Sequence, residues 1–167
     1  ERGQIPAVNL RIAGVYDDEC HSIPLSNQMQ RIIENQLESH LFAGDPSHGA
    51  SFVHMDDLID AIFLCFEKRK QLPPLTTFLI GEDMTMSYDA IQKLIGRLVH
   101  KKEWKTFSVP KPIAKVGAWC QQHLPFMKPS FIQPWMVDIA DDHFELDISK
   151  AKQLLGWTPK HHVDQEI

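Results

Sequence analysis

The chain has 167 residues, of which 43% are hydrophobic and 23% charged, and its net charge is −5 with neutral histidines. This length fits one domain, and the composition is that of a globular protein rather than a disordered, collagen-like or coiled-coil one. The charge and the lack of a basic stripe exclude nucleic-acid binding as the main role. The longest apolar run, residues 61–66, is far below the roughly 20 residues that cross a bilayer, so no membrane partner is expected.

Strands and helices alternate along the chain. The predicted strands are residues 7–13, 51–54, 77–80 and 106–109. The predicted helices are residues 28–39, with Asn27 and Gln30 as a capping pair, and a segment opened by Asp56 and Asp57 and closed at residue 70. The expected buried face of the second helix comprises Leu58, Ala61, Ile62, Cys65 and Phe66. Further helices are a segment capped by Ser87, one that starts near Pro112, residues 135–140, and one capped by Asp147 and stopped by Gly156. Residues 14–27 and 124–134 are predicted loops. This alternation predicts an α/β fold with a largely parallel sheet, whose ligands bind at the carboxyl ends of the strands.

The three cysteines, Cys20, Cys65 and Cys120, are widely spaced and odd in number. This usage predicts reduced thiols in a cytoplasmic protein rather than a disulfide framework or a zinc site. The histidines form no HExxH motif.

Four segments occur in an order that is typical of one family. They are LRIAGVY (10–16), FVHMDDL (52–58), FLIG (78–81), and DISKA with LGWTP (147–151 and 155–159). Together they resemble the C-terminal half of the NAD-dependent epimerase/dehydratase group, the extended short-chain dehydrogenase/reductases. FVHMDDL is the most specific of the four.

The resemblance implies a two-lobed parent enzyme, in which an N-terminal Rossmann lobe binds NAD or NADP and a smaller C-terminal lobe binds the substrate. The implied fold is a few mostly parallel strands with flanking helices and a small helical substrate lobe. Residues 1–167 are then one substrate-binding domain, and the missing Rossmann lobe is its expected partner. Exposure of the surface facing that lobe predicts self-association, for example as a homodimer, or a marginally stable monomer.

The chain departs from the family in its catalytic and phosphate-binding residues. It has no glycine-rich phosphate loop, and neither Tyr16 nor Tyr88 is followed by a lysine four residues later. We therefore expect no catalytic residue in this chain, which should be inactive alone as a fragment of a longer enzyme. Gly14 and Ala50 stand where sugar-nucleotide members often have Asn and Arg, which makes a nucleotide-sugar substrate less favoured. Phosphate contacts could instead come from Arg97 or Lys111.

The resemblance implies that the backbone of Ile12, Ala13 and Val15 lies beside the nicotinamide ring. The alternative for these residues is a strand-to-loop turn packed under the sheet. Gly14, Tyr16, Met84 and Arg97 are the expected substrate-binding residues. A further set of apolar residues is expected to form either the lid and wall of the substrate pocket or ordinary core. The set is Met84, Met86, Trp119, Phe126, Met127, Phe131, Trp135 and Met136.

Several other residues have a structural explanation beside a functional one. Arg11 lies mid-strand among apolar residues, so its guanidinium is expected to be buried and to pair with Asp56 or Asp57 rather than with a ligand. His54 is expected to be a core histidine rather than a catalytic one. The position of the two aspartates at a helix start explains them more simply than metal binding does. The acidic cluster at residues 138–143 and the pair His161-His162 are expected to face solvent, so no metal ligand is predicted.

The sequence leaves two functions open. The first is the substrate-binding part of an NAD(P)-dependent oxidoreductase, epimerase or dehydratase, which acts on a hydroxyl-bearing, sugar-like small molecule by hydride transfer. The second is a non-catalytic relative that binds a dinucleotide or a protein as a regulator or assembly factor. Turnover of NAD(P)H by the full-length protein distinguishes the two.

Overall fold

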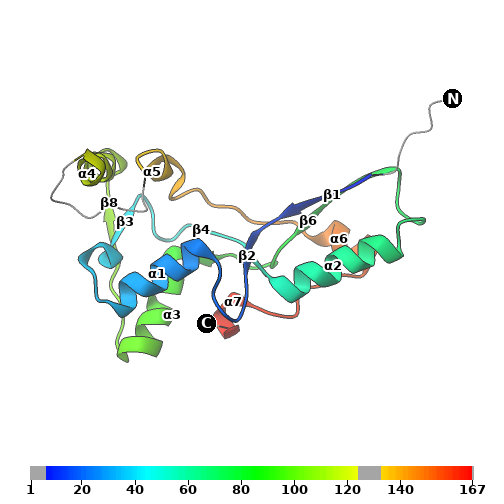
Figure 1. Ribbon diagram of the computed structural model, residues 1–167, viewed down its shortest axis with the longest axis horizontal. Coiled ribbons are helices and arrows are strands. Elements are labelled where there is room, and N and C mark those ends of the chain that lie inside the picture. Colours follow the sequence, from blue (N-terminus) through cyan, green and yellow to red (C-terminus); the bar gives the residue numbers. More distant parts are fainter. Residues whose placement is uncertain (1–6, 124–132, 167) are drawn as a thin grey trace. The chain divides into compact units, whose positions relative to one another are not determined.

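The computed structural model describes residues 7–123 and 133–166 (Figure 1). The chain divides into two compact units, each built from separate chain segments. Unit 1 lies within Glu1–Ser26, Ala50–Thr85 and Phe144–Ile167, and unit 2 lies within Asn27–Gly49 and Met86–His143.

Both units mix short strands with helices. Unit 1 contains β1 (Ala7–Ile12), β2 (Gly14–Tyr16), β5 (Phe52–His54), α2 (Met55–Glu67), β6 (Leu75–Ile80), α6 (Ser149–Leu155) and α7 (Val163–Glu166). Unit 2 contains the 3-10 helix η1 (Leu37–His40), β3 (Leu41–Ala43), β7 (Met86–Ser87), α3 (Tyr88–His100), β8 (Phe107–Val109), α4 (Lys111–His123) and α5 (Met136–Ile139). Helix α1 (Ile23–Ile33) and strand β4 (Gly49–Ala50) cross the division between them.

Three of the strand pairs are parallel, as the alternation of strands and helices predicts. β1 pairs with β6 in a register that places Leu10 opposite Phe78 and Ile12 opposite Ile80. β2 pairs with β5, and β3 pairs with β8, also in parallel. The expected α/β fold class is thus confirmed.

The core of unit 1 lies between the β1–β6 pair and helices α2 and α6. Leu58, Ala61 and Cys65 of α2 pack there against Phe78 and Ile80 of β6. These α2 positions are spaced as one helical face, which is the stripe that the sequence predicts. Ile62 and Phe66 were expected on the same face, but they are 49% and 65% exposed, so that part of the prediction is wrong.

The opposite face of the β1–β6 pair is open. Asn9 and Arg11 of β1 and Leu75 of β6 are exposed, and Leu75 is 70% exposed. The buried guanidinium expected for Arg11 is therefore wrong, because this side chain lies on the uncovered side of the strand. Parallel sheets in proteins usually have both faces covered, so this surface is incomplete for a parallel sheet.

In unit 2, helix α3 follows the sequence prediction closely. The hydroxyl of Ser87 accepts a hydrogen bond from the backbone N–H of Ala90 at 3.1 Å, which is the predicted cap. Gly96 of α3 allows a close approach of Trp104, since a Cβ at this glycine would lie 2.5 Å from the Trp104 side chain. The indole is 1% exposed, which makes it a central packing group of this unit.

The first predicted helix is displaced. Helix α1 begins at Ile23 rather than at residue 28, so Asn27 lies inside it and the predicted capping pair of Asn27 with Gln30 is wrong. Pro24 suits a first helical turn, where no N–H is needed. Asn35 has a φ of 51°, a left-handed conformation that stops α1 before the predicted end at residue 39.

Two further predictions concern loops. β2 lies inside the predicted loop 14–27, because pairing with β5 supplies hydrogen-bond partners that a local pattern does not show. In the predicted loop 124–134, residues 124–132 lie outside the described residues, and so do Phe126, Met127 and Phe131 of the predicted lid.

Candidate functional site

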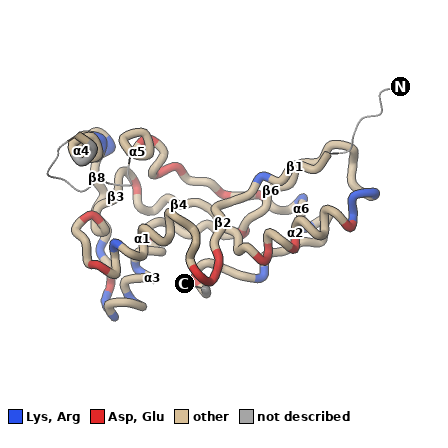
Figure 2. Tube along the Cα trace, in the orientation of Figure 1, with Lys and Arg blue, Asp and Glu red and all other residues tan. Residues whose placement is uncertain are grey.

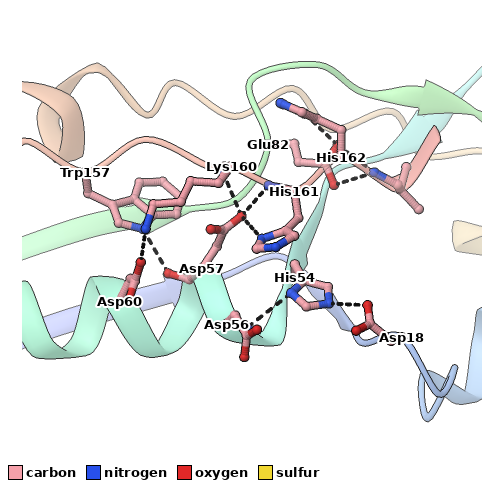
Figure 3. A network of polar contacts seen from close by, with 11 residues as sticks. Asp18, His54, Asp56, Asp57, Asp60, Glu82, Trp157, Lys160, His161 and His162 are labelled. Carbon is pink, nitrogen blue, oxygen red and sulfur yellow. Dashed lines mark hydrogen bonds and ion pairs between the residues drawn. The ribbon is translucent and has the colours of Figure 1, made fainter. Parts of the chain in front are cut away.

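A network of polar side chains in unit 1 surrounds the junction between β5 and α2 (Figure 3). His54 is the last residue of β5 and the N-cap of α2, and its Nδ1 accepts from the backbone N–H of Asp56 at 3.3 Å. Asp56 and Asp57 stand in the first turn of α2, where carboxylates oppose the positive end of the helix dipole. Figure 2 shows acidic residues at this end of α2 and basic residues beyond its other end. The interpretation of the two aspartates as helix-start residues is thus confirmed.

Asp57 binds the C-terminal segment, Trp157 to His161, to α2 through hydrogen bonds. Its side chain is 1% exposed, and Oδ2 accepts hydrogen bonds from the backbone N–H groups of Lys160 and His161, both at 2.9 Å. The indole Nε1 of Trp157 donates to the backbone oxygen of Asp57, also at 2.9 Å. One buried residue therefore holds the segment from Trp157 to His161 at three points.

His54 is a buried histidine with two aromatic neighbours. Its side chain is 3% exposed, and Nε2 lies 3.1 Å from Oδ1 of Asp18. The ring of Tyr16 meets it edge-on at 5.2 Å between centroids, and the ring of His161 lies at 4.3 Å. The expectation of a satisfied core histidine is confirmed.

Glu82 is a second buried carboxylate that holds the C-terminal segment. Its two oxygens lie 3.2 and 3.4 Å from the backbone N of Val163, and His162 Nδ1 lies 3.6 Å from Oε2. Burial raises the pKa of Glu82, while hydrogen bonds from Val163, His162 and Tyr16 and the charge of His162 act in the opposite direction.

The expected solvent-facing position of His161 and His162 is wrong. Both side chains are only 32% exposed and face buried carboxylates, Asp57 and Glu82 respectively. The sequence offered no local signal for this, because the partners come from segments far away along the chain. Glu82 was also missed, although its place directly after β6 and Gly81, at the carboxyl end of a parallel strand, is a detectable signal.

The residues expected beside the nicotinamide lie where β1 ends. Ile12 is 46% exposed, which is high for the last residue of an apolar strand. Ala13 donates its backbone N–H to the oxygen of Ile80 at 2.9 Å, and Gly14 donates to the oxygen of Ser51 at 3.2 Å. Val15 is half-buried against the unit 1 core. The turn thus carries an apolar, accessible side chain on a hydrogen-bonded backbone.

The expected substrate-binding residues have four different environments. Gly14 lies close to Phe52, since a Cβ on it would be 3.0 Å from that ring. Tyr16 is 4% exposed, and its side chain acts to lower the pKa of Glu82. Met84 is 71% exposed. Arg97 belongs to unit 2, where its guanidinium pairs with Glu103. Their substrate contacts stay a prediction.

Unit 2 contains an apolar cavity of about 340 Å³. Side chains from β3, β8, α4 and α5 line it, among them Phe42, Val109, Ile113, Ala118, Cys120 and Val137. Lysines of α4 contact the acidic cluster at residues 138–143: Lys111 pairs with Asp141, and Lys115 pairs with Asp138 at 2.6 Å. Of the predicted lid, Trp119 and Trp135 are 54% and 60% exposed.

Comparison with solved structures identifies the fold. The chain superposes on UDP-glucose 4-epimerase of Thermotoga maritima, solved with UDP-glucose, at a TM-score of 0.60 and 19% identity over 95% of this chain and 42% of that one. For UDP-glucuronic acid 4-epimerase of Bacillus cereus with NAD, the TM-score is 0.63 and the identity 18%, over 96% and 42%. For dTDP-glucose 4,6-dehydratase of Bacillus anthracis with NAD, the values are 0.59 and 16%, over 96% and 42%.

The chain thus has the fold of the C-terminal portion of extended short-chain dehydrogenase/reductases, and it spans about two-fifths of these structures. The fold expected from the four sequence segments is confirmed. Neither a protein-family model nor a curated protein sequence matches the chain. Among the described residues, no helix combines the length and the hydropathy that a membrane span requires.

Proposed function

We propose that this chain is the substrate-binding part of an NAD(P)-dependent epimerase, dehydratase or related oxidoreductase. The observation that carries the proposal is the fold, which matches sugar-nucleotide epimerases and a dehydratase over at least 95% of this chain. The nicotinamide would exchange a hydride with a carbon that bears a hydroxyl group. The substrate class is a hydroxyl-bearing, sugar-like small molecule.

The residues of this chain fit only one side of the cofactor. The apolar, accessible Ile12 and the ordered backbone of Ala13 and Val15 suit the face of a nicotinamide ring at the carboxyl end of a parallel strand. The chain has no glycine-rich turn to hold a pyrophosphate and no Tyr-x-x-x-Lys pair to move a hydroxyl proton. Both groups therefore belong to a further lobe, and the chain alone is inactive.

The open side of the β1–β6 pair is the surface that we assign to this lobe. Within the described residues, β1 pairs with β6 alone, so its other edge keeps unpaired backbone N–H and C=O groups. Exposed edges and uncovered faces of parallel sheets are unfavourable. A further parallel strand would pair the edge, and a helix of the same lobe would cover the face. The exposed Asn9 and Arg11 supply polar contacts on this face.

The first test reads the coding sequence upstream of Glu1 and then assays the full-length protein. We expect a glycine-rich βαβ start, a Tyr-x-x-x-Lys pair, and turnover of NAD(H) or NADP(H) with sugar-like substrates. Binding of the dinucleotide without turnover would instead favour the non-catalytic relative that the sequence left open. Absence of both would refute the proposed function.

The second test perturbs the nicotinamide side in the full-length protein. Ile12→Glu places a charge where we expect the ring, so the dissociation constant of the dinucleotide should rise at least tenfold. Ile59→Glu is the matched control, since Ile59 lies on α2 of the same unit and is 41% exposed against 46% for Ile12. Equal effects of the two variants on fluorescence-detected binding would contradict the assignment.

A further inference from the structure

Three potential metal ligands meet where the C-terminal segment crosses the start of α2. They are His54, Asp56 and His161, and one ligand atom from each lies within 4.8 Å of the others. His54 is buried, His161 is half-buried and Asp56 is exposed, so the cluster is reachable from solvent on one side. Two imidazoles and one carboxylate are a donor set that divalent transition metals such as Zn²⁺ favour.

A carboxylate lies beside one nitrogen of each histidine ring. Asp18 Oδ1 lies 3.1 Å from Nε2 of His54, and Asp57 Oδ2 lies 3.3 Å from Nδ1 of His161 (Figure 3). The contact of His54 with Asp18 is a hydrogen bond, and metal-binding histidines usually have such a partner, because a carboxylate that receives one ring proton fixes the tautomer and leaves the other nitrogen with its lone pair. The contact of His161 with Asp57 is electrostatic and lacks hydrogen-bond geometry. The remaining nitrogen of His54, Nδ1, accepts the 3.3 Å cap hydrogen bond from the Asp56 N–H, which a bound metal ion would replace.

The three donor atoms must move closer together to bind one ion. Ligand atoms around a tetrahedral zinc ion are about 3.3 Å apart, given bonds of about 2.0 Å. The present spread of up to 4.8 Å closes by rotation of the exposed Asp56 and the half-buried His161, while the buried His54 stays fixed.

The local charge decides whether a cation is tolerated at a helix N-terminus. The dipole of α2 places roughly half a positive charge there, which opposes a cation. Three carboxylates, Asp18, Asp56 and Asp57, surround the cluster and outweigh it. Lys160 is the nearby cation, and its ammonium pairs with Asp60 one turn further along the helix.

We propose that His54, Asp56 and His161 bind one divalent transition-metal ion of the zinc type, with Asp18 orienting the ring of His54. Three protein ligands leave a fourth position for water. The ion would bind the C-terminal segment to the start of α2. It would thereby add to the hydrogen bonds that Asp57 already makes with Lys160 and His161. The sequence predicted no metal ligand because His161 reaches the site only through the tertiary fold. The proposal is independent of the proposed function, since no nicotinamide is needed for its test.

The test titrates the chelator-treated 167-residue chain with Zn²⁺ by calorimetry and follows Co²⁺ by its visible absorption. We expect one equivalent of Zn²⁺, a rise in the melting temperature on binding, and no binding of Mg²⁺, which prefers oxygen ligands. Asp56→Asn removes an exposed ligand with little risk to folding, and it should raise the zinc dissociation constant at least tenfold. His161→Gln should do the same.

Two control variants separate this site from adventitious binding. Asp60→Asn makes the same charge change one turn further along α2, and it should leave the zinc affinity within twofold. His143→Gln removes a histidine of unit 2 that lies 5.5 Å from the ring of His48, and it should also leave binding unchanged. No stoichiometric binding, or equal losses in Asp60→Asn and Asp56→Asn, or loss in His143→Gln would overturn the proposal.

Discussion

Removal of the Asp57 carboxylate tests how the C-terminal segment is held. Asp57→Ala deletes two hydrogen bonds from backbone N–H groups to a buried, charged acceptor, each 2.9 Å long. Hydrogen bonds to charged groups contribute about 1.5–3 kcal/mol each, so the pair contributes about 3–6 kcal/mol. Water can reach the part-buried amides of Lys160 and His161 in the variant, which favours the lower half of that range, about 3–4 kcal/mol.

The matched control is Asp60→Ala on the same helix. Its carboxylate is 47% exposed and pairs with the ammonium of Lys160, which is 67% exposed. Exposed ion pairs contribute about 0–1 kcal/mol, so this variant should be nearly as stable as the wild type. Urea denaturation followed by tryptophan fluorescence measures both free energies of unfolding. If the two variants differ by less than about 1 kcal/mol, the assignment of Asp57 as the anchor is refuted.

Three further changes probe other parts of the fold. Ser87→Ala should cost about 1 kcal/mol, because the Ala90 amide loses its cap, and thermal unfolding checks this. Gly156→Ala should also destabilise by about 1 kcal/mol, since the φ of 65° is left-handed; an unchanged urea midpoint would contradict it. Glu82→Gln tests how the free energy of unfolding depends on pH. Burial raises the pKa of Glu82 above its ordinary 4.5, so the folded state binds this proton more tightly than the unfolded state does. Wild-type stability should therefore fall as pH rises from about 4.5 through the raised value, and urea midpoints of the glutamine variant should lack this fall.

Local patterns sufficed for the elements whose signals are short in range. The Ser87 cap, the apolar face of α2 at Leu58, Ala61 and Cys65, and the left-handed stop at Gly156 need only neighbours along the chain. Each is a hydrogen bond, a spacing or a backbone conformation that a few consecutive residues determine.

Long-range pairing accounts for what the sequence did not reveal. β2 exists because β5 lies beside it, and Arg11 is exposed because one face of the β1–β6 pair is uncovered. His161 and Glu82 gained their environments from the return of the C-terminal segment to α2 and β5. No periodicity records such contacts, since the partners are far apart along the chain.

The division of unit 1 among three chain segments bears on how the protein is made. β1 and β2, the α2–β6 segment, and α6 with the Asp57-bound segment are separated by the two segments of unit 2. On the ribosome, every residue of unit 2 emerges before Phe144, so unit 2 can fold while unit 1 still lacks Ala151, Leu155 and Trp157 of its core. Until those residues arrive, the apolar faces of α2 and β6 remain exposed to chaperones and to other nascent chains. Completion of unit 1 thus comes after all of unit 2 has emerged, and it depends on the arrival of the segment Phe144–Ile167.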